Sequence, residues 1–389
     1  MRKVKSVFNC ILGVVAFLLS LVLLLCIAWQ IRPGEVAAVS LARGELIPRL
    51  ETEVSLAKSD AFAGIARIRK TYRLPMEDLA GPVPAEEGFC TFPVSEAGRV
   101  MDLIARAEDS GLLDGQSTVF SPDLNFYEKS EIACYLDDTT LILCWKELTD
   151  NKIISYAEAK IQDASQFRRK LSGDRFGSDS QSVTSEMSKA ANAIIAMNGD
   201  YYNFRDYGIS VYQGQLRRFS ETSFSPGTVS YSYTDTCFLT ENGDLEYFRK
   251  GDVTTLAEME KYVEDRGVLW SLSFGPVLVD NFEIQPNLDD YPIGEATKKA
   301  SRAGIAQVDD LHYLYMNVSW TNPDWTLHGA TYAMEAEYFQ EKGVRSAYNL
   351  DGGQTAEITF RHVPFNYVDY GAERYNSDCI YFATALPDS

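Results

Sequence analysis

Four strand-like runs of this chain each carry a glycine with a charged or amide residue beside it. The runs are AIIAMNGDYYNFRD at 193–206, SFGPVLVDN at 273–281, SRAGIAQVDD at 301–310 and AYNLDGG at 347–353. Glycine lets a substrate lie close to the main chain, and loops on a rigid scaffold carry a large share of binding and catalytic residues. The pattern therefore predicts a β scaffold whose loops form a substrate site.

Composition limits the class of protein and its partners. Of the 389 residues, 46% are hydrophobic and 12% aromatic, enough to bury a core and to exclude wholesale disorder. The formal net charge of −19 argues against nucleic acid as a partner, because its phosphates would be repelled. A basic site in so acidic a chain must come from particular arginines near the glycine loops.

The N-terminus predicts a membrane segment. Three basic residues within the first five positions precede an apolar stretch from about Ile11 to Trp29, near the roughly 20 residues that a span needs. No Ala-x-Ala pattern follows Trp29, so we expect an uncleaved signal-anchor within residues 1–35 rather than a cleaved signal peptide. Because the basic residues should stay in the cytoplasm, the rest of a single-pass protein is expected outside it.

Cysteine and histidine spacing bears on metals and redox chemistry. The seven cysteines contain no CxxC pair, which argues against a zinc cluster or a redox motif. Cys134 and Cys144 flank a predicted hairpin, where they form either a disulfide or buried free thiols. The three histidines have no HxH or HExxH spacing. We expect no cofactor, with an all-oxygen calcium site made from aspartates as the alternative, although no EF-hand spacing occurs.

The chain divides into three predicted regions. After the membrane segment, residues 36–117 are predicted to be a helical stalk and linker, with a second helix following Ser95 in EAGRVMDLIARAEDS. From residue 118 onward, short β-like runs are punctuated by turns, and residues 118–389 are predicted to be one domain. Hairpin turns are expected at 137–138, 213–214, 242–243 and 309–310.

Two helices are expected within the β-rich region. One covers about 179–193, and the other is GATYAMEAEYFQEKG at 329–343, which ends at a glycine. The second lies between the strands HYLYMNVSW and VRSAYNL and so forms a β-helix-β unit. The predicted class is α+β, a central mixed β-sheet domain with flanking helices.

The run at 193–206 places an amide, a glycine and a carboxylate at a strand end, as Asn198, Gly199 and Asp200. Tyr201 and Tyr202 follow and are candidates to stack on a sugar ring, and Arg205 comes next. An ordinary strand-end turn is the alternative, because Asn-Gly and Gly-Asp are common in turns.

Arg302 stands just before a strand, where a guanidinium can bind a phosphate or carboxylate through two parallel hydrogen bonds. A surface salt bridge is the alternative for this residue. The NLDGG loop presents Asn349 and Asp351 beside Gly352 and Gly353, with a tight turn as the alternative.

Further residues complete an ordered set of motifs. The set comprises NGDYY at 198–202 with Arg205, GPVLVDN at 275–281, Ser301-Arg302 with Gly304, Gly329 before the second helix, NLDGG at 349–353, and ERYNSDCIYF at 373–382 with Arg374, Ser377 and Asp378. In this order the motifs resemble the phosphodiester glycosidase family, which includes the enzyme that uncovers mannose 6-phosphate on lysosomal enzymes and many bacterial exopolysaccharide-related proteins. The resemblance covers roughly Ser155 to Ala383.

The resemblance implies a hydrolase for a sugar linked through a phosphodiester in a surface glycan or wall polymer. Asp200 and Asp351 would supply the acid and base or nucleophile pair, and Arg302 would bind the phosphate. Substrate-binding roles are expected for eight residues, which are Asn198, Gly199, Arg205, Asn349, Gly352, Gly353, Thr355 and Asp378.

One departure supports a second hypothesis. The family usually continues the double glycine with glycine or glutamine and two serines, whereas this chain has Gln354, Thr355 and Ala356, so one hydroxyl is lost. A non-catalytic protein that binds or assembles a cell-wall polymer or exopolysaccharide is therefore the alternative function.

Overall fold

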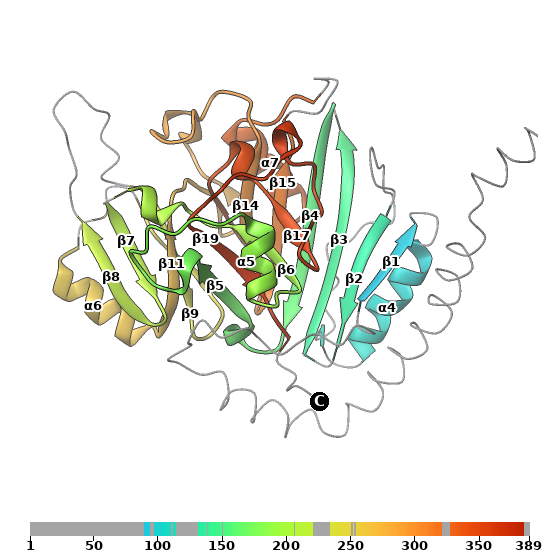
Figure 1. The fold of residues 1–389 in the computed structure, drawn as a ribbon, viewed down its shortest axis with the longest axis horizontal. Coiled ribbons are helices and arrows are strands. Elements are labelled where there is room, and N and C mark those ends of the chain that lie inside the picture. Colours follow the sequence, from blue (N-terminus) through green and yellow to red (C-terminus); the bar gives the residue numbers. More distant parts are fainter. Residues whose placement is uncertain are drawn as a thin grey trace, which may run out of the picture. The chain divides into compact units, whose positions relative to one another are not determined.

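The computed structural model describes residues 89–93, 97–109, 112–113, 131–137, 139–149, 151–205, 207–220, 234–249, 252, 254–320 and 327–384, which are coloured by residue number in Figure 1. The predicted membrane segment and the predicted stalk up to residue 88 lie outside these ranges. Over the described ranges, no helix is both long enough and apolar enough to span a bilayer.

The largest sheet has the strand order β1-β2-β3-β4-β15-β14-β16-β12-β13. Its strands are β1 (Phe89–Pro93), β2 (Glu131–Leu136), β3 (Thr140–Thr149), β4 (Lys152–Ile161), β15 (His312–Val318), β14 (Arg302–Asp309), β16 (Ser346–Asn349), β12 (Val277–Asp280) and β13 (Glu283–Ile284). Long neighbouring strands in this sheet alternate direction, so backbone donors and acceptors are paired along each ladder.

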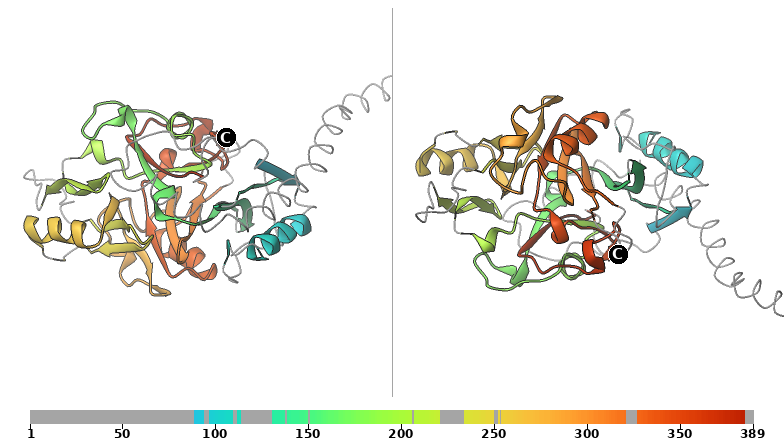
Figure 2. Two further views of the ribbon diagram at one scale, coloured as in Figure 1. Left: turned by 90° about the horizontal axis from the view of Figure 1, so that it is seen from below. Right: turned by 90° about the horizontal axis from the view of Figure 1, so that it is seen from above.

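A second sheet has the order β18-β17-β6-β19-β5. Its strands are β18 (Val363–Pro364), β17 (Ile358–Phe360), β6 (Ile195–Asn198), β19 (Asp378–Phe382) and β5 (Phe167–Leu171). A three-stranded sheet contains β10 (Leu245–Phe248), β9 (Thr236–Thr240) and β11 (Val268–Ser273), and β7 (Gly208–Tyr212) pairs with β8 (Gln215–Ser220). Figure 2 shows these sheets from two further directions.

The four predicted hairpin turns are confirmed. They join β2 to β3, β7 to β8, β9 to β10 and β14 to β15. In the β7–β8 turn, Gln213 and Gly214 both have positive φ, of 52° and 71°. Two such residues match the right-handed twist of the strands in a two-residue hairpin.

Four helices are described, α4 (Ala97–Asp109), α5 (Thr184–Ala190), α6 (Leu256–Asp265) and α7 (Tyr332–Glu341). The helix expected after Ser95 is α4. The helix expected over 329–343 is α7, which begins after the N-cap Thr331 and ends before Gly343 at a φ of 70°. The helix expected over 179–193 is shorter than predicted, because only α5 within it is helical.

The domain is sheet-rich with few helices, as predicted, but its strand directions differ from the expected mixed arrangement. The predicted β-helix-β unit is formed by β15, α7 and β16. β14 lies between the two strands and pairs antiparallel with both, so β15 and β16 run parallel without being neighbours. Every pairing between the described strands is antiparallel.

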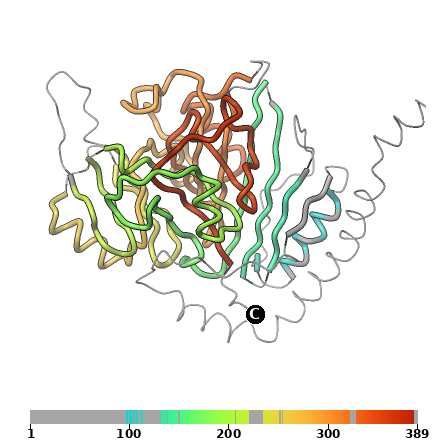
Figure 3. The backbone as a smooth tube through the Cα atoms, in the orientation of Figure 1, coloured from blue at the N-terminus to red at the C-terminus, as the bar shows by residue number. Residues whose placement is uncertain are grey.

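The expected division at residue 118 cuts across the large sheet. β1 pairs with β2 over its whole length, and α4 packs against both strands. Part of the segment that we assigned to a stalk is therefore continuous with the β domain. Figure 3 shows the backbone of the domain as a tube in the orientation of Figure 1.

Strand register bears on the cysteine alternatives. Cys134 lies opposite Leu143 on β3 and opposite Cys90 on β1, while Cys144 lies opposite Ala133. Cys134 and Cys144 are thus not cross-strand partners, and the predicted alternative of a disulfide between them is wrong. Cys144 is a buried free thiol.

One aromatic cluster joins the sheets. The Phe167 ring centroid lies 4.2 Å from that of Phe382 within the second sheet, 4.9 Å from Tyr313 in the large sheet and 4.8 Å from Trp270 in the three-stranded sheet. All four side chains are buried, in a core with members from all three sheets. Aromatic pairs at such distances add to the stabilisation from buried area.

Phe167→Ala should therefore lower the free energy of unfolding by about 3–5 kcal/mol, because the cavity would face three sheets at once. Chemical denaturation monitored by circular dichroism measures the change. Phe204→Ala is the control, since that ring is 52% exposed, and it should cost much less. Equal losses in the two variants would contradict the central position of Phe167.

Candidate active site

The predicted site segments meet where strands of the two larger sheets end. Asn198 closes β6, Asp378 opens β19 and Asn349 closes β16. The Asn198 side-chain amide donates to the main-chain oxygen of Asp351 at 2.7 Å, and its Oδ1 accepts from the Glu357 N–H at 3.1 Å. Asn198 thus holds the NLDGG loop in place instead of presenting its amide to a ligand.

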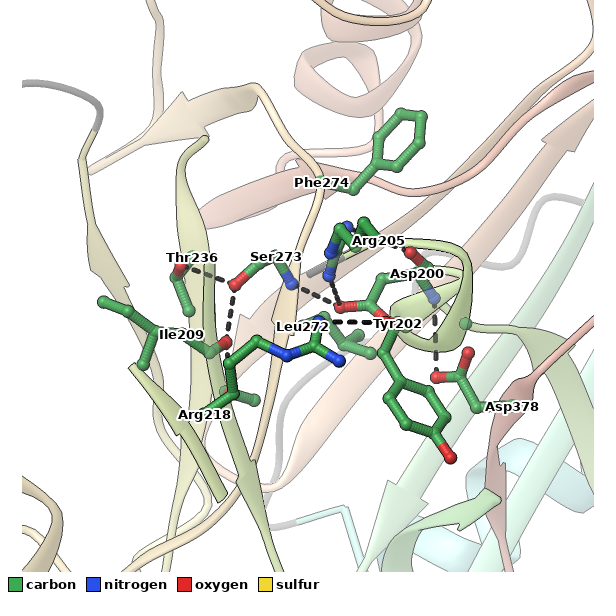
Figure 4. Close-up of polar contacts among 12 residues, drawn as sticks. Asp200, Tyr202, Arg205, Ile209, Arg218, Thr236, Leu272, Ser273, Phe274 and Asp378 are labelled. Carbon is green, nitrogen blue, oxygen red and sulfur yellow. Dashed lines mark hydrogen bonds and ion pairs between the residues drawn. The ribbon is translucent and has the colours of Figure 1, made fainter. Parts of the chain in front are cut away.

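Asp200 is fully buried and surrounded by donors. Its carboxylate accepts from Arg169 at 2.7 Å, from Arg205 at 2.5 Å and from the Ser273 N–H at 2.6 Å. Figure 4 shows it between Arg205 and the main chain of Ser273, with Asp378 nearby. Burial opposes ionisation, but the two guanidinium groups and the N–H outweigh it and lower the pKa of Asp200.

Asp378 shares Arg169 with Asp200. The Arg169 Nε lies 2.8 Å from the Asp378 carboxylate, and Ser377 donates to its other oxygen at 3.1 Å. Burial raises the pKa of Asp378, although Arg169 partly opposes the shift. A Cβ on Gly199 would lie 2.0 Å from the Asp378 carboxylate, so glycine is needed there for packing.

Asp351 differs from these two carboxylates because it is partly exposed. Its Oδ2 accepts from the Thr355 hydroxyl at 2.8 Å, and the same hydroxyl contacts the Gly352 carbonyl at 2.6 Å. Burial by the surrounding loops raises the pKa of Asp351 to about 6, while Thr355 and the charge of Arg374 lower it. Asp351 can therefore exchange a proton near neutral pH.

The structure places Arg302 in a different role from the predicted phosphate clamp. Its guanidinium donates to the carbonyls of Ala330 at 2.9 Å, Gly294 at 2.8 Å, Glu295 at 3.2 Å and Lys298 at 2.7 Å. The side chain is 3% exposed and lies over the Tyr332 ring. These hydrogen bonds hold the guanidinium against main-chain carbonyls, so Arg302 supports the 294–300 segment.

The glycines and the amide of the NLDGG loop also have structural roles. Asn349 is buried and donates to the Gly275 carbonyl at 2.6 Å. A Cβ on Gly352 would lie 2.5 Å from the Ser301 carbonyl oxygen, and the Gly353 N–H donates to that oxygen at 3.0 Å. The loop must therefore pass close to Ser301, which fixes where Asp351 stands.

The two tyrosines expected to stack on a sugar have separate positions. Tyr202 is fully buried, stacked on Phe176 and beneath Arg169, so a ligand cannot reach it. Tyr201 is partly exposed and packs edge-on against Phe274 at 5.3 Å. Only Tyr201 retains the predicted role.

Two arginines of the site were given no role in the sequence interpretation. Arg169 holds both Asp200 and Asp378, and it also donates to the Ser271 carbonyl. Its signal was the basic run Arg168-Arg169-Lys170 within an apolar context of an acidic chain. Arg374 is exposed, and its charge acts on Asp351. It was noted as part of the closing motif but given no role.

The described ranges contain no group of three or more histidine, cysteine, aspartate or glutamate side chains able to hold a metal ion. The aspartate oxygens that a calcium site would need are bonded to arginines at Asp200 and Asp378, whose charge disfavours a cation there.

Comparison with known proteins defines the class. Residues 191–383 match the model of the phosphodiester glycosidase family, which confirms the resemblance drawn from the ordered motifs. This part of the chain is therefore similar to a phosphodiester glycosidase domain. The match begins after β5, so Arg169 contributes to the site from outside it.

The solved structures that the chain matches are distant from it in sequence. The catalytic domain of zebrafish N-acetylglucosamine-1-phosphodiester alpha-N-acetylglucosaminidase, auto-inhibited by its pro-peptide, is 14% identical with a TM-score of 0.47, and the match covers 63% of this chain and 83% of that one. A hypothetical protein from Synechocystis is 11% identical with a TM-score of 0.44, covering 65% and 64%. No curated protein sequence gives a significant match.

Arg302→Lys tests the structural assignment, because lysine keeps the charge but cannot serve four separate carbonyls. We expect the free energy of unfolding to fall by about 2–4 kcal/mol, the sum of several modest hydrogen bonds. Arg217→Lys on the exposed face of β8 is the control and should change little. Unchanged stability with a selective loss of phosphodiester binding would instead support the predicted phosphate-binding role of Arg302.

Glu335 supports a second prediction. It is fully buried on α7, both carboxyl oxygens lack a hydrogen-bond partner, and burial raises its pKa to about 8 against an opposing effect of Arg302. The native state therefore binds a proton that the unfolded chain releases near pH 4.3, and stability falls as pH rises from there to about 8. Glu335→Gln should therefore raise the free energy of unfolding at high pH by a few kcal/mol, because each unit of pKa difference corresponds to about 1.4 kcal/mol.

Thermal or denaturant unfolding at pH 5, 7 and 9 measures this effect. The stability advantage of Glu335→Gln over the unmodified protein should grow with pH. Glu341→Gln, on the exposed side of the same helix, is the control for the loss of a carboxylate from α7. A pH-independent difference for Glu335→Gln would mean that this carboxyl titrates normally.

Proposed function

We propose that this chain is a hydrolase that cleaves the bond between a sugar and a phosphodiester in a surface glycan or wall polymer. The phosphodiester glycosidase domain at 191–383 supports the reaction class. The observation that carries the proposal is Asp351, a partly exposed carboxyl whose pKa is raised by burial to about 6 although the charge of the exposed Arg374 lowers it. The apolar stretch near the N-terminus supports attachment to the membrane, with this domain outside the cytoplasm.

Asp351 acts as the general base in the proposed reaction. At neutral pH its carboxylate is mostly ionised and takes a proton from the attacking water. The water oxygen bonds to the anomeric carbon, and the bond from that carbon to the phosphate oxygen breaks. The electron pair of that bond leaves with the phosphate ester, whose charge Arg374 stabilises. The products are a free sugar and a phosphate monoester.

This assignment uses one carboxylate where the sequence suggested two. Asp200 cannot transfer a proton to a substrate, because it is fully buried and both oxygens accept from arginine. Its role is to hold Arg169 and Arg205 in place. A second acid is dispensable here, because a phosphate ester leaves as a weakly basic anion and needs little protonation.

Electrostatics favours an anionic substrate at this point of an acidic chain. Arg205 and Arg218 lie close enough for their charges to oppose each other, since burial and then the charge of Arg205 lower the pKa of Arg218. Arg169 and Arg374 add two further positive charges. Four arginines therefore act on Asp200 and Asp351, and their positive charge favours a phosphodiester.

Asp351→Asn should lower kcat/KM on a sugar-1-phosphodiester by about 10²–10⁴-fold, because the amide cannot accept the proton of water. In the unmodified protein, kcat/KM should rise with pH through about 6 as Asp351 ionises. The measurement is release of free sugar by the purified full chain from a chromogenic substrate panel, with and without EDTA. Asp290→Asn, an exposed carboxylate, is the control.

The same assay distinguishes hydrolysis from the alternative function, which is binding or assembly of a polymer. Retained activity in Asp351→Asn would contradict the assigned base. Binding of wall polymer without sugar release, even after long incubation, would make the chain a binding or assembly protein. The Ala356 position where the family carries a second serine is 2% exposed, so this substitution lies in the core and does not remove a group from the surface of the loop.

A further inference from the structure

An exposed tyrosine stands in a strained turn beside the NLDGG loop. Tyr370 lies in the turn Asp369–Gly371, at a φ of 62° and a ψ of 11°. A hydrogen bond from the Gly371 N–H to the Val368 carbonyl, at 3.0 Å, closes the turn. Glycine or asparagine is preferred at a turn position with positive φ, because a bulky side chain crowds the main chain there. Tyr370 is nevertheless 58% exposed, so the strain does not serve to bury its ring, and such strain points to a function.

The residue before Tyr370 is connected to the NLDGG loop through Ser301. The Ser301 hydroxyl donates to the Asp369 carboxylate at 2.6 Å, and the Ser301 carbonyl accepts from the Gly353 N–H at 3.0 Å. Ser301 and Asp369 are both buried. The connection is therefore shielded from water and holds the turn against the loop.

A second connection follows Tyr370 along the chain. The Gln354 side chain donates to the Ala372 carbonyl at 3.0 Å, and the segments 353–355 and 369–371 pack against each other. Tyr370 is therefore fixed from both sides, next to loop residues that follow Asp351 directly in the sequence.

The surface around Tyr370 is open to a ligand. A Cβ added at Gly353 or at Gly371 would meet no atom of the described part of the chain within 4 Å. Gly353 is partly exposed, and Gly371 and Ala372 are exposed. A ligand on the Tyr370 ring can therefore extend along the main chain of the loop that carries Asp351.

A second tyrosine with positive φ serves the same loop from another segment. Tyr201 has a φ of 49° and is partly exposed. It follows Asn198, whose side-chain amide donates to the Asp351 carbonyl at 2.7 Å. Two accessible tyrosine rings are thus held by different residues of one loop, which gives surfaces for two sugar units.

We propose that Tyr370 stacks on a sugar ring of the substrate outside the cleaved sugar–phosphate bond, so that the substrate is a glycan chain and not a single sugar phosphodiester. The inference deepens the proposed function and rests on it. The C–H groups on one face of a pyranose carry partial positive charge, and they pack on the negative face of an aromatic ring. Stacking of this kind needs an exposed ring held in one place, as Tyr370 is.

Phe282 provides a matched control, because it combines a φ of 67° with 54% exposure. Its positive φ belongs to the two-residue hairpin turn between β12 and β13, which requires such a conformation. The Phe282 N–H donates to the Arg345 carbonyl at 2.8 Å, just before β16, whereas the NLDGG loop lies at the other end of β16. Replacing Phe282 therefore removes a similar ring away from the site.

The first experiment measures the free energy of unfolding of the full chain by chemical denaturation. Tyr370→Asn should be at least as stable as the unmodified protein, because asparagine adopts this φ more readily than tyrosine. Phe282→Asn should behave in the same way. A loss of stability in Tyr370→Asn beyond that in Phe282→Asn would show that the ring supports the fold, and would overturn the proposal.

The second experiment measures sugar binding without any reaction. Calorimetry with the full chain uses neutral hexasaccharides of glucose, galactose and N-acetylglucosamine as probes. For the probe that binds, Tyr370→Asn should raise Kd by about 3–10-fold, the usual contribution of one aromatic contact. Tyr370→Phe, which keeps the ring, and Phe282→Asn should match the unmodified protein. No binding of any probe, an unchanged Kd in Tyr370→Asn, or an equal loss in either other variant would overturn the proposal.

The third experiment measures sugar release from phosphodiesters of different length. Each cleaved sugar-1-phosphodiester is compared with forms lengthened by two sugars, either on the released sugar or on the phosphate side. Tyr370→Asn should raise KM about 3–10-fold for a lengthened form, and leave kcat and the KM of the short form unchanged. An equal rise for short and lengthened forms would overturn the proposal. If the unmodified protein releases no sugar, the proposed function fails, and calorimetry still decides whether Tyr370 binds a sugar.

Discussion

The buried ion pairs of Asp200 are the constraint on which the rest of the site depends. Asp200 joins Arg169 of β5 and Arg205 of the segment after β6, and it also accepts from the main chain of β11. Because none of the three side chains is exposed beyond 1%, removing one partner would leave an uncompensated buried charge, at a cost of about 3–5 kcal/mol. The network fixes the end of β6, and Asn198 at that end fixes Asp351.

Local features of the fold could be predicted from the sequence, whereas the strand order could not. Turn pairs such as Gln213-Gly214 carry their own conformational preference, and the helix at α7 has its N-cap and closing glycine in the sequence. The second sheet brings together β5, β6, β17 and β19, which are far apart along the chain. Nothing local specifies that assembly, because it depends on which apolar faces share a core such as that around Phe167.

The candidate residues were found more reliably than their roles. Asn198, Asp200, Asp351 and Asp378 do meet, because strand ends with small residues deliver polar groups to one place. Arg302 shows the limit, since its neighbouring glycine and serine reveal nothing about the direction of its guanidinium, which turns to carbonyls 4–8 residues earlier and to Ala330. Arg169 was missed for the converse reason, because its partners lie 31 and 209 residues away.

Protonation of buried carboxyls also lowers the negative charge near the site, which favours an anionic ligand. The chain has a net charge of −19, and the carboxylates around the NLDGG loop would repel a phosphodiester if all of them were ionised. Burial raises the pKa of Glu335 to about 8 and that of Glu357 to about 9, so both are neutral at pH 7. Asp200 is offset by two arginines. In the proposed reaction, the positive charge of Arg374 therefore remains available to the phosphodiester, and Asp351 is a partly exposed carboxyl that can ionise.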